Sequence, residues 1–310
     1  MHKPTFDPGL TQQYIGTLRR AINKDGTFNV RRRGASWRHI HPYLHLINMG
    51  WASFLAVTFV AFFTVNTIFA VIYFSLGPGQ LQGADAPAAN LRFLNDFFFS
   101  AHTLTTVGYG SIAPSGIAAN FVAALEAMTG LMGFAVITGV LFGRVSRPSA
   151  RIGFSDHMLI APYQDGTSLQ FRVVNLRPNM LMNLEGNVVL MTVDGPPGDL
   201  KRSFQPLKLE RDGVNFLALT WTLVHPIDET SPLYGKTAEE LQRLQAEVLI
   251  LIKAFDDTFS QTVHARYSYR YDEMVWGAKF KPAFEIDASG DMILEVDQVG
   301  SHALVEAAAR

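Results

Sequence analysis

One short run of residues in this sequence can do chemistry, the hexapeptide Thr-Thr-Val-Gly-Tyr-Gly at positions 105–110. Backbone carbonyl oxygens of such a run can replace the hydration shell of a potassium ion, so the run predicts a potassium filter. Successive carbonyls point to one side only where some residues have positive φ, and we expect this at Gly108 and Gly110. The residues predicted to bind potassium are Thr106, Val107, Gly108, Tyr109 and Gly110.

The side chains of this run have separate predicted roles. Thr106 can add its hydroxyl oxygen at the inner end of the filter, whereas Val107 and Tyr109 point away from the ion and pack behind the loop. One loop makes only one wall of a pore, so four chains must meet around an axis. A Gly-Tyr-Gly tripeptide alone is also typical of a flexible turn. The filter interpretation depends on context, because the run follows a half-length apolar helix and lies between two long apolar segments.

The composition divides the chain into an apolar first half and a more polar second half. The chain has 310 residues, of which 48% are hydrophobic and 17% charged, with a net charge of -1. Soluble domains average about 25% charged residues, and the deficit here is concentrated in the first half. Cysteine is absent, which excludes disulfides and thiolate metal sites. The length allows a small membrane unit and one soluble domain of about 150 residues.

Residues 1–45 are expected to form a cytoplasmic N-terminal segment, and its residues 1–30 are polar and lack the apolar core of a signal peptide. After the basic run at 31–33, aromatic, basic and apolar residues are mixed, which favours a short helix lying on the membrane surface. An ordinary cytoplasmic linker is the alternative. His41 and His45 have the spacing of a metal-binding pair, although an interfacial position suits their surroundings better.

Two long segments are apolar enough to cross a membrane. The outer helix, at residues 46–76, carries no charge and is long enough for a hydrocarbon core of about 30 Å. Trp51 and Tyr73 near its ends fit interface anchors. The inner helix is expected at residues 116–146. With the filter and a pore helix between them, these helices make a predicted pore domain at residues 46–148.

The pore helix is expected at residues 94–105, with Asn95 or Asp96 as its N-cap. At about 1.5 Å per residue this helix reaches only halfway through a bilayer. Its C-terminal end points a negative dipole at the pore centre, which favours a cation. His102 lies behind the filter, where it is either a titratable group that tunes the filter or, more simply, a packed neutral histidine.

Between residues 116 and 143 the only charged residue is Glu126. An intramembrane carboxylate normally faces protein or water, and His102 is a candidate partner. Small residues at 123, 127, 130 and 133 allow close helix approach. The residues predicted to line the pore or form its gate are Ala127, Gly130, Phe134, Thr138 and Phe142, with Gly130 as a bending point and Phe142 as a hydrophobic constriction. Lipid-facing packing is the alternative for the aromatic residues.

Basic residues flank the start of the outer helix and the end of the inner one. By the positive-inside rule both termini are expected in the cytoplasm. The same residues are candidate ligands of anionic lipid headgroups: Arg31, Arg32, Arg33, Arg38, Arg144, Arg147 and Arg151. The alternative is that they only mark the topology.

Residues 149–310 show short alternating apolar patterns separated by turn residues, which predicts a β-sandwich. Further strands are expected at 157–163, 184–193, 203–210, 216–225, 247–255, 262–270, 274–285 and 291–297, beside one at 169–173. A capping box from Thr237 to Glu240 predicts a helix at 237–246. The sequence has no nucleotide loop, nucleophile elbow or HExxH motif, so we expect neither an enzyme nor an organic cofactor, and no nucleic-acid partner.

Five motifs together resemble one family, the inward-rectifier potassium channels, in the prokaryotic branch called KirBac. They lie at 106–110, 144–148, 171–177, 225–233 and 265–277, and the resemblance covers roughly residues 31–298. It implies a homotetramer, a slide helix at about 35–46, an inner-helix gate and an immunoglobulin-like cytoplasmic domain that extends the pore. It also implies a second constriction, the G-loop, at Asp256, Asp257, Thr258, Phe259 and Ser260.

Several positions depart from the pattern of that family. The inner-helix position that holds an acid in strong rectifiers is Phe134, and the pore-helix position that often holds glutamate is His102. Ser111 and Ile112 stand where many eukaryotic members have an arginine after the filter. The G-loop segment lacks glycine, which places its gating role in question.

The sequence therefore predicts two transmembrane helices with a re-entrant pore helix and filter, followed by an immunoglobulin-like cytoplasmic β-sandwich. We expect a tetrameric, potassium-selective channel of a prokaryotic inner membrane, modulated by anionic lipid and the cytoplasmic domain, with polyamines or magnesium as candidate pore blockers. The alternatives are a two-pass membrane anchor that presents a ligand-binding sandwich without conduction, and a pore that conducts without selectivity.

Overall fold

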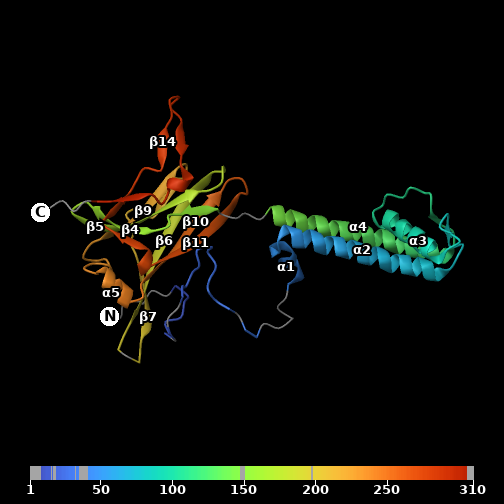
Figure 1. Ribbon diagram of the computed structural model, residues 1–310, viewed down its shortest axis with the longest axis horizontal. Helices are drawn as coiled ribbons and strands as arrows, with labels where there is room; N and C mark the ends of the chain where they lie inside the picture. Colours follow the sequence, from blue (N-terminus) through green and yellow to red (C-terminus); the bar gives the residue numbers. More distant parts are fainter. Residues whose placement is uncertain are drawn as a thin grey trace. The chain divides into compact units, whose positions relative to one another are not determined.

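The computed structural model describes residues 8–14, 16, 19–31, 33–34, 41–146, 151–196 and 198–305. The chain divides into two compact units, Arg33–Arg147 and Met1–Arg32 with Pro148–Arg310. We call them the helical unit and the β unit (Figure 1). The first residues of the chain thus belong to the β unit, although the helical unit separates them from it in sequence.

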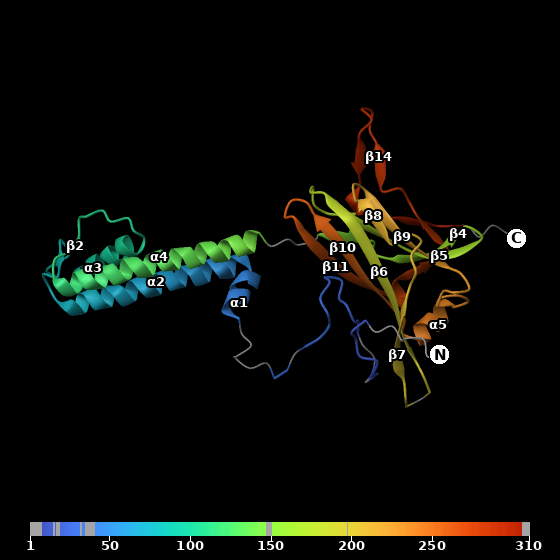
Figure 2. The same ribbon diagram turned by 180° about the vertical axis from the view of Figure 1, so that it is seen from behind.

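The described residues of the helical unit form four helices. Helix α1 covers Pro42–Asn48, α2 Trp51–Leu76, α3 Ala89–Leu104 and α4 Ile117–Val145. By length and composition, α2 and α4 are candidate membrane spans. At about 1.5 Å per residue, each exceeds a hydrocarbon core of about 30 Å. Helices α2 and α4 lie side by side, and the shorter α3 packs beside the C-terminal part of α2 and the N-terminal part of α4, as the two views agree (Figures 1 and 2).

The start of the outer helix differs from the sequence prediction. Instead of one helix from residue 46, the chain forms α1, an extended break at Met49 and Gly50, and then α2. Pro42 occupies the first turn of α1, where its missing N–H has no intrahelical partner to lose. The predicted slide helix overlaps α1 at residues 42–46, and its residues 35–40 lie outside the described part of the chain.

The pore helix also begins earlier than predicted, at Ala89, so the predicted N-cap at Asn95 or Asp96 is wrong. Both residues lie inside α3, where Asn95 donates from Nδ2 to the Ala84 carbonyl oxygen at 3.0 Å. A two-stranded pairing of β1 (Leu81–Gln82) with β2 (Ala113–Pro114) joins the loops on either side of α3. The side chain of Asn95 therefore ties the first loop to the helix rather than capping it.

The β unit is built on two five-stranded sheets. The first contains β6 (Leu181–Asp194), β7 (Lys201–Pro206), β8 (Gly213–Phe216), β10 (Glu247–Asp256) and β11 (Gln261–Arg270). The second contains β3 (Ile152–Phe154), β4 (Met158–Tyr163), β5 (Gly166–Asn175), β9 (Thr220–Ile227) and β12 (Met274–Trp276). Their facing sides share one core that includes Phe171, Leu190, Leu223, Ile250 and Tyr269. This arrangement is the predicted β-sandwich.

Two of the predicted strands are divided. The segment 274–285 forms β12, β13 (Ala278–Phe280) and the start of β14 (Phe284–Ile286). Gly277, with a φ of 66°, breaks the strand direction between β12 and β13. The segment 291–297 forms β15 (Met292–Leu294), which pairs with β14, and a 3-10 turn at Val296–Gln298. Strand β13 pairs with the last strand, β16 (His302–Leu304).

The alternation predicted at residues 169–173 is confirmed on one face, where Leu169, Phe171 and Val173 are buried. Arg172 on the other face is buried as well, which alternation did not predict. Its guanidinium donates to the Lys281 carbonyl oxygen at 2.7 Å and lies 4.7 Å from the Phe280 ring centroid. Strand β5 is therefore covered on both faces.

The capping box is confirmed at the start of α5 (Ala238–Arg243). The Thr237 hydroxyl accepts from the Glu240 N–H at 3.3 Å, and the Glu240 carboxylate accepts from the Thr237 N–H at 3.1 Å. The helix ends earlier than the predicted residue 246, because Gln245 has a φ of 47°.

Residues 19–28, which we call the N-terminal strap, lie against the outer face of the β6–β10–β11 sheet. Ile22 is buried there beside Met191, Phe204 and Leu249. The Ser268 hydroxyl donates to the Ile22 carbonyl oxygen at 2.7 Å. The strap therefore supplies part of the cover that this sheet face needs.

Candidate ion-conduction site

The filter run follows directly on the C-terminal end of α3. Its φ values are 61° at Thr106, 57° at Gly108 and 79° at Gly110, whereas Val107 and Tyr109 are not in the positive region. The positive φ predicted at the two glycines is confirmed. Thr106 also has a positive φ, which was not predicted. A β-branched residue rarely adopts this conformation, which costs it roughly 1–3 kcal/mol. Alternating backbone conformations are what turn successive carbonyl oxygens to one side.

The last turn of α3 holds this loop in place. The His102 carbonyl oxygen accepts from the N–H of Val107 at 2.9 Å and from that of Gly108 at 3.3 Å. The His102 ring meets the Tyr109 ring edge-on, with centroids 4.9 Å apart. His102 thus packs behind the filter, as the simpler interpretation expected, and Tyr109 lies against the pore helix.

Glu126 has partners that the sequence did not predict. Its carboxylate accepts from the Tyr73 hydroxyl at 2.6 Å on one oxygen and from the Ser100 hydroxyl on the other. The predicted pairing with His102 is wrong, since that ring contacts Tyr109 instead. The prediction of Tyr73 as an interface anchor is also wrong, because only 2% of the residue is exposed.

The same cluster extends to the outer helix through Asn66. The Ser100 hydroxyl lies 3.0 Å from the Asn66 side-chain oxygen, and Asn66 donates to the Phe62 carbonyl oxygen at 2.8 Å. Because Asn66 belongs to α2, Ser100 to α3 and Glu126 to α4, this buried cluster ties the three helices together. Only the intramembrane glutamate itself signalled it in the sequence.

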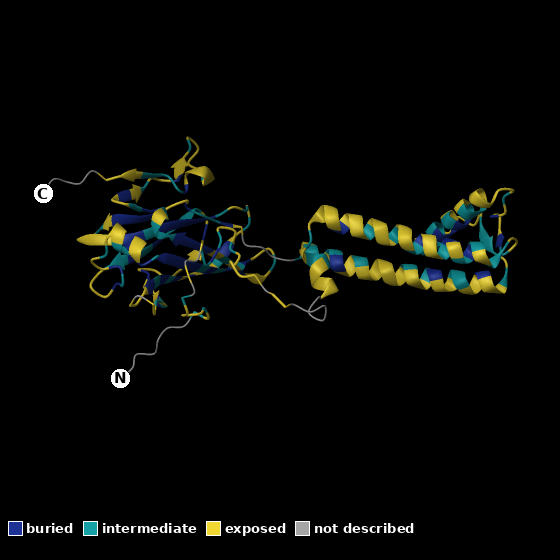
Figure 3. Cartoon of the chain, turned by 60° about the horizontal axis from the view of Figure 1, so that its bottom comes forward, coloured by how far each residue is buried: buried dark blue, intermediate teal, exposed yellow. Residues whose placement is uncertain are grey.

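Among the predicted pore residues, Gly130 packs most tightly. A Cβ at Gly130 would lie 2.1 Å from the Leu104 carbonyl oxygen, so glycine lets α4 approach the end of α3. This confirms the predicted close approach at this position. Phe134, Thr138 and Phe142 are exposed in the single chain, and Ala127 is half-buried. Figure 3 shows that much of both long helices, α2 and α4, is exposed in the single chain.

Only part of the predicted basic collar falls on described residues, namely Arg31, Arg33, Arg144 and Arg151; Arg32, Arg38 and Arg147 lie outside them. Arg31, Arg33 and Arg151 are exposed. The guanidinium of Arg144 is already engaged with the carbonyl oxygens of Leu46, Ile47 and Met49. This engagement argues against the predicted headgroup contact at Arg144.

The predicted G-loop segment is the turn between β10 and β11, where Asp256 pairs with Gln261. The buried Asp256 carboxylate accepts from the N–H groups of Thr258 at 3.0 Å and Phe259 at 3.3 Å. Ser260 has a φ of 49°. A carboxylate and a left-handed serine thus close this turn in place of glycine.

His225, in another of the motifs, has a structural role. Its Nδ1 lies 2.6 Å from the Lys208 carbonyl oxygen, so Nδ1 donates and Nε2 accepts from the Ser231 hydroxyl at 2.8 Å. Burial lowers the pKa of His225. The neutral ring therefore joins β9 to the loop that contains Ser231.

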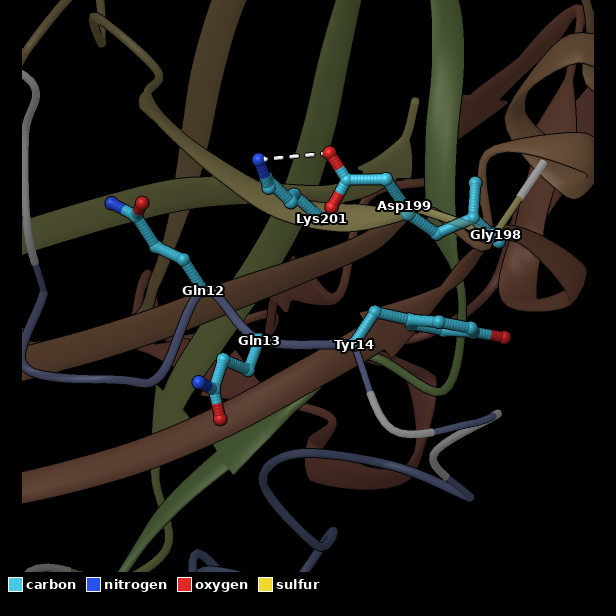
Figure 4. A pocket seen from close by; sticks show the side chains of 7 residues that line it. Gln12, Gln13, Tyr14, Gly198, Asp199 and Lys201 are labelled. Atoms are coloured by element: carbon cyan, nitrogen blue, oxygen red, sulfur yellow. Dashed lines mark ion pairs between the residues drawn. The ribbon is translucent and has the colours of Figure 1, made fainter. Parts of the chain in front are cut away.

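In the described part of the chain, no group of three His, Cys, Asp or Glu side chains is arranged to hold a metal ion. Among the described residues, His41 and His45 therefore have no third side chain that could complete a metal site with them. A cavity of about 660 Å³ is lined by Gln12, Gln13 and Tyr14 and by residues 198–201 (Figure 4). Its ion pair, Lys201 with Asp199 at 3.1 Å, is exposed, so we assign it no role in conduction.

A 16-residue helix, shorter than the two candidate membrane spans on either side of it in sequence, ends in a loop of alternating φ. This arrangement defines the pore unit of an ion channel. Residues 60–147 match the family model described as "Ion channel". Residues 152–309 match the model "Inward rectifier potassium channel C-terminal domain". The chain therefore belongs to the inward-rectifier potassium channels, in the prokaryotic KirBac branch.

Similar proteins support this membership over most of the chain. Inward rectifier potassium channel Kirbac3.1 of Paramagnetospirillum magnetotacticum is 34% identical over 281 residues, which cover 89% of this chain and 93% of that protein. ATP-sensitive inward rectifier potassium channel 10 of Homo sapiens is 30% identical, and the match covers 94% of this chain and 82% of that protein. G protein-activated inward rectifier potassium channel 3 of Mus musculus is 27% identical, and the match covers 93% of this chain and 78% of that protein. The chain is thus a potassium channel of a membrane and not an enzyme.

Proposed function

We propose that this chain forms a homotetramer that conducts potassium selectively through residues 106–110. The alternation of positive φ at Thr106, Gly108 and Gly110, directly after the short helix α3, carries the proposal. Potassium ions are the only bound ions that we propose for the filter, and we propose no organic cofactor for the protein. The membrane is a prokaryotic inner membrane, and both termini are cytoplasmic.

The apolar side chains around the filter support a tetramer. In the single chain Val107 is 50% exposed and Tyr109 is 75% exposed. Side chains of this size need cover beside a pore, and neighbouring copies around a four-fold axis supply it. Phe134 and Phe142, exposed on α4, then face the axis or a neighbouring subunit.

The proposed organisation assigns conduction to residues 46–148 and modulation to the segments on either side. Residues 1–45 carry the interfacial helix, and residues 149–310 form the cytoplasmic domain. The main gate lies at the inner-helix bundle, where Phe142 forms an apolar neck that dewets. The β10–β11 turn at 256–260 is proposed as the second constriction.

Anionic lipid is the proposed modulator at the cytoplasmic leaflet. The ligands are Arg31, Arg32, Arg33, Arg38, Arg147 and Arg151. Each basic residue near such a surface contributes about 1 kcal/mol, less at high salt. If the response to phosphoinositides survives Arg147→Gln combined with Arg151→Gln, the headgroup site lies elsewhere.

Rubidium uptake into liposomes that contain the purified protein tests conduction and selectivity together. We expect uptake that external potassium reduces and external sodium does not. Absence of uptake by a tetramer that is intact on size-exclusion chromatography would favour the non-conducting membrane anchor. Equal competition by sodium would favour the unselective pore.

A further inference from the structure

Two histidines that are far apart in sequence meet in the β unit. His157 ends the turn between β3 and β4, and His302 is the first residue of β16. Their imidazole rings lie with centroids 5.8 Å apart at an interplanar angle of 67°. Because His157 is exposed and His302 is half-buried in the single chain, solvent reaches the pair.

The backbone holds both histidines in place. The Ser155 hydroxyl donates to the His157 carbonyl oxygen at 2.9 Å and thereby fixes the turn before β4. A Cβ at Gly300 would lie 3.3 Å from the backbone nitrogen of Asp156, so the turn before β16 packs directly on the turn before β4. His302 itself belongs to the ladder of β16 with β13. The ring contact therefore follows from packed backbone segments and not from two loose side chains.

One of the two rings already has the orientation of a metal ligand. Nδ1 of His302 lies 2.9 Å from the Gly300 carbonyl oxygen. A carbonyl oxygen only accepts, so Nδ1 carries the hydrogen and the neutral ring keeps its lone pair on Nε2. Histidines that bind metals usually donate their second ring N–H to a carbonyl or carboxylate in this way, which fixes the tautomer and the ring.

The separation of the two rings suits a shared ion. A zinc–nitrogen bond of about 2.0–2.1 Å places the centre of a coordinated imidazole about 3.2 Å from the ion. Two such rings at the tetrahedral angle have centres about 5.2 Å apart, so a small rotation of the exposed His157 side chain closes the observed 5.8 Å. Asp156 lies on the same pair of turns, with Oδ2 3.6 Å from the Cβ position of Gly300, and its negative charge favours a cation there.

We propose that His157 and His302 together bind a divalent transition-metal ion of the kind that prefers imidazole, such as zinc, with water in the remaining positions. In the described part of the chain no third protein ligand stands beside the pair, so we expect moderate affinity and an ion that exchanges. His41 and His45 lack a third ligand as well, and within the described chain neither of them has the orienting hydrogen bond that His302 has.

A bound ion would join β4 of the sandwich to β16, the last strand of the described chain. Chain ends are poorly ordered unless something ties them down, and an ion that binds only the folded state stabilises that state by mass action. We therefore expect zinc to raise the thermal unfolding midpoint of the β unit. The inference concerns the β unit alone and does not depend on whether the chain conducts.

Isothermal titration calorimetry of the full-length protein with zinc chloride tests the site. The protein is purified without a polyhistidine tag, and all samples carry His41→Gln and His45→Gln, so that the α1 pair does not contribute. We expect one zinc ion per chain, which excess magnesium does not displace, because magnesium prefers oxygen ligands.

The two histidines are then replaced one at a time in this background. Loss of a residue that only orients a ligand already weakens metal binding about 10–100-fold, so His157→Gln and His302→Gln should each weaken zinc binding at least as much. His264→Gln, at an exposed position of β11, is the matched control and should bind zinc normally. Absence of zinc binding in the background protein, binding that survives in His157→Gln or His302→Gln, or displacement by magnesium would overturn the proposal.

Thermal unfolding provides a second measurement. Excess zinc is expected to raise the unfolding midpoint of the background protein and to leave the midpoints of His157→Gln and His302→Gln unchanged. Because His157 is exposed, His157→Gln is expected to keep the zinc-free midpoint, so it tests the site even if His302→Gln loses stability. An equal zinc-induced rise in His157→Gln and in the background protein would overturn the proposal.

Discussion

The hydroxyl of Tyr73 donates a hydrogen bond of 2.6 Å to the carboxylate of Glu126, and both residues are buried between the helices of the pore unit. Because Ser100 donates to the second carboxylate oxygen, hydroxyl groups from α2 and α3 satisfy this acid of α4. The acid thus connects the outer, pore and inner helices close to the filter, and its loss is expected to loosen their packing.

Tyr73→Phe removes one donor and leaves a buried carboxylate oxygen unsatisfied. A buried group that loses its partner costs about 1–3 kcal/mol, so we expect a lower thermal unfolding midpoint for the detergent-solubilised protein. Tyr234→Phe is the matched control, since Tyr234 is 56% exposed in the β unit. Equal midpoints for both variants would show that the Tyr73–Glu126 bond contributes little to stability.

Gly108→Ala is expected to reduce selectivity for potassium over sodium. Gly108 has a φ of 57°, and a Cβ there would meet no atom of the described chain within 4 Å, so the effect comes from the backbone. A left-handed conformation costs an L-residue roughly 1–2 kcal/mol, which moves the carbonyl oxygens from the ion path. Gly139→Ala, in the regular helix α4 and equally free of close atoms in the described chain, should keep wild-type selectivity. Reversal potentials measure both, and unchanged selectivity in Gly108→Ala tetramers would count against the filter.

Phe142→Ala is expected to raise basal rubidium flux, because shortening the side chain widens and wets the apolar neck. Phe142 is 73% exposed in the single chain. Phe121→Ala, at the other end of α4, removes a ring that is 66% exposed and serves as the control. If flux does not change in an intact Phe142→Ala tetramer, the gate belongs at Phe134 or in the cytoplasmic domain.

Rectification by internal spermine is expected to be weak in the unmodified channel and steep in Phe134→Asp. A blocking cation that crosses the whole transmembrane voltage gains only about 2.3 kcal/mol per charge per 100 mV. Block of the pore therefore also needs a site that retains the cation. A ring of carboxylates provides it by focusing negative potential in the pore. Phe134→Asn, of the same shape as Asp without its charge, is the control in bilayer recordings.

Steep rectification without the substitution would point to another acid. Glu126 and Asp256 are buried and accept hydrogen bonds within the chain, which makes them poor candidates. Asp257, exposed at the β10–β11 turn, would be the residue to test next.

The N-terminal strap is expected to detach in acid. Burial alone raises the pKa of Glu273, but the hydrogen bonds from Lys24 and the Arg270 N–H, with the charge of Arg20, bring it below its usual value of 4.5. A carboxyl whose pKa is lower in the folded state stabilises that state above the usual value, and this contribution is lost as the pH falls through the lowered pKa. The protection factors of strap amides, which correct exchange rates for the intrinsic effect of pH, should therefore be high at neutral pH and fall below about pH 4.5.

Glu273→Gln should lower the protection factors of the strap amides at neutral pH and make them less dependent on acid. Glu229→Gln, at an exposed position of the β unit, is the control. If exchange in the Glu273→Gln strap keeps the wild-type acid dependence, other groups hold the strap. Glu247 would then be examined, since its carboxylate accepts from the Ala21 N–H at 3.0 Å.

Local patterns of the sequence determined much of this protein. The steric freedom of Gly108 and Gly110 predicted their positive φ, and the uncharged length of the two spans predicted α2 and α4. The capping box at Thr237 predicted the start of α5. These features depend on residues close together in the chain, where backbone sterics and transfer from water act without reference to the rest of the fold.

The tertiary structure alone decided which distant side chains meet. The sequence showed that Glu126 needs a partner, but only the packing of three helices selected Tyr73 and Ser100 over His102. In the same way, the contact of α1 with α4 gave Arg144 the carbonyl groups of residues 46–49, where its charge alone suggested lipid. A hydrogen bond depends on distances of a few tenths of an ångström between atoms far apart in sequence. Composition and spacing do not contain those distances, because they arise only when the helices pack.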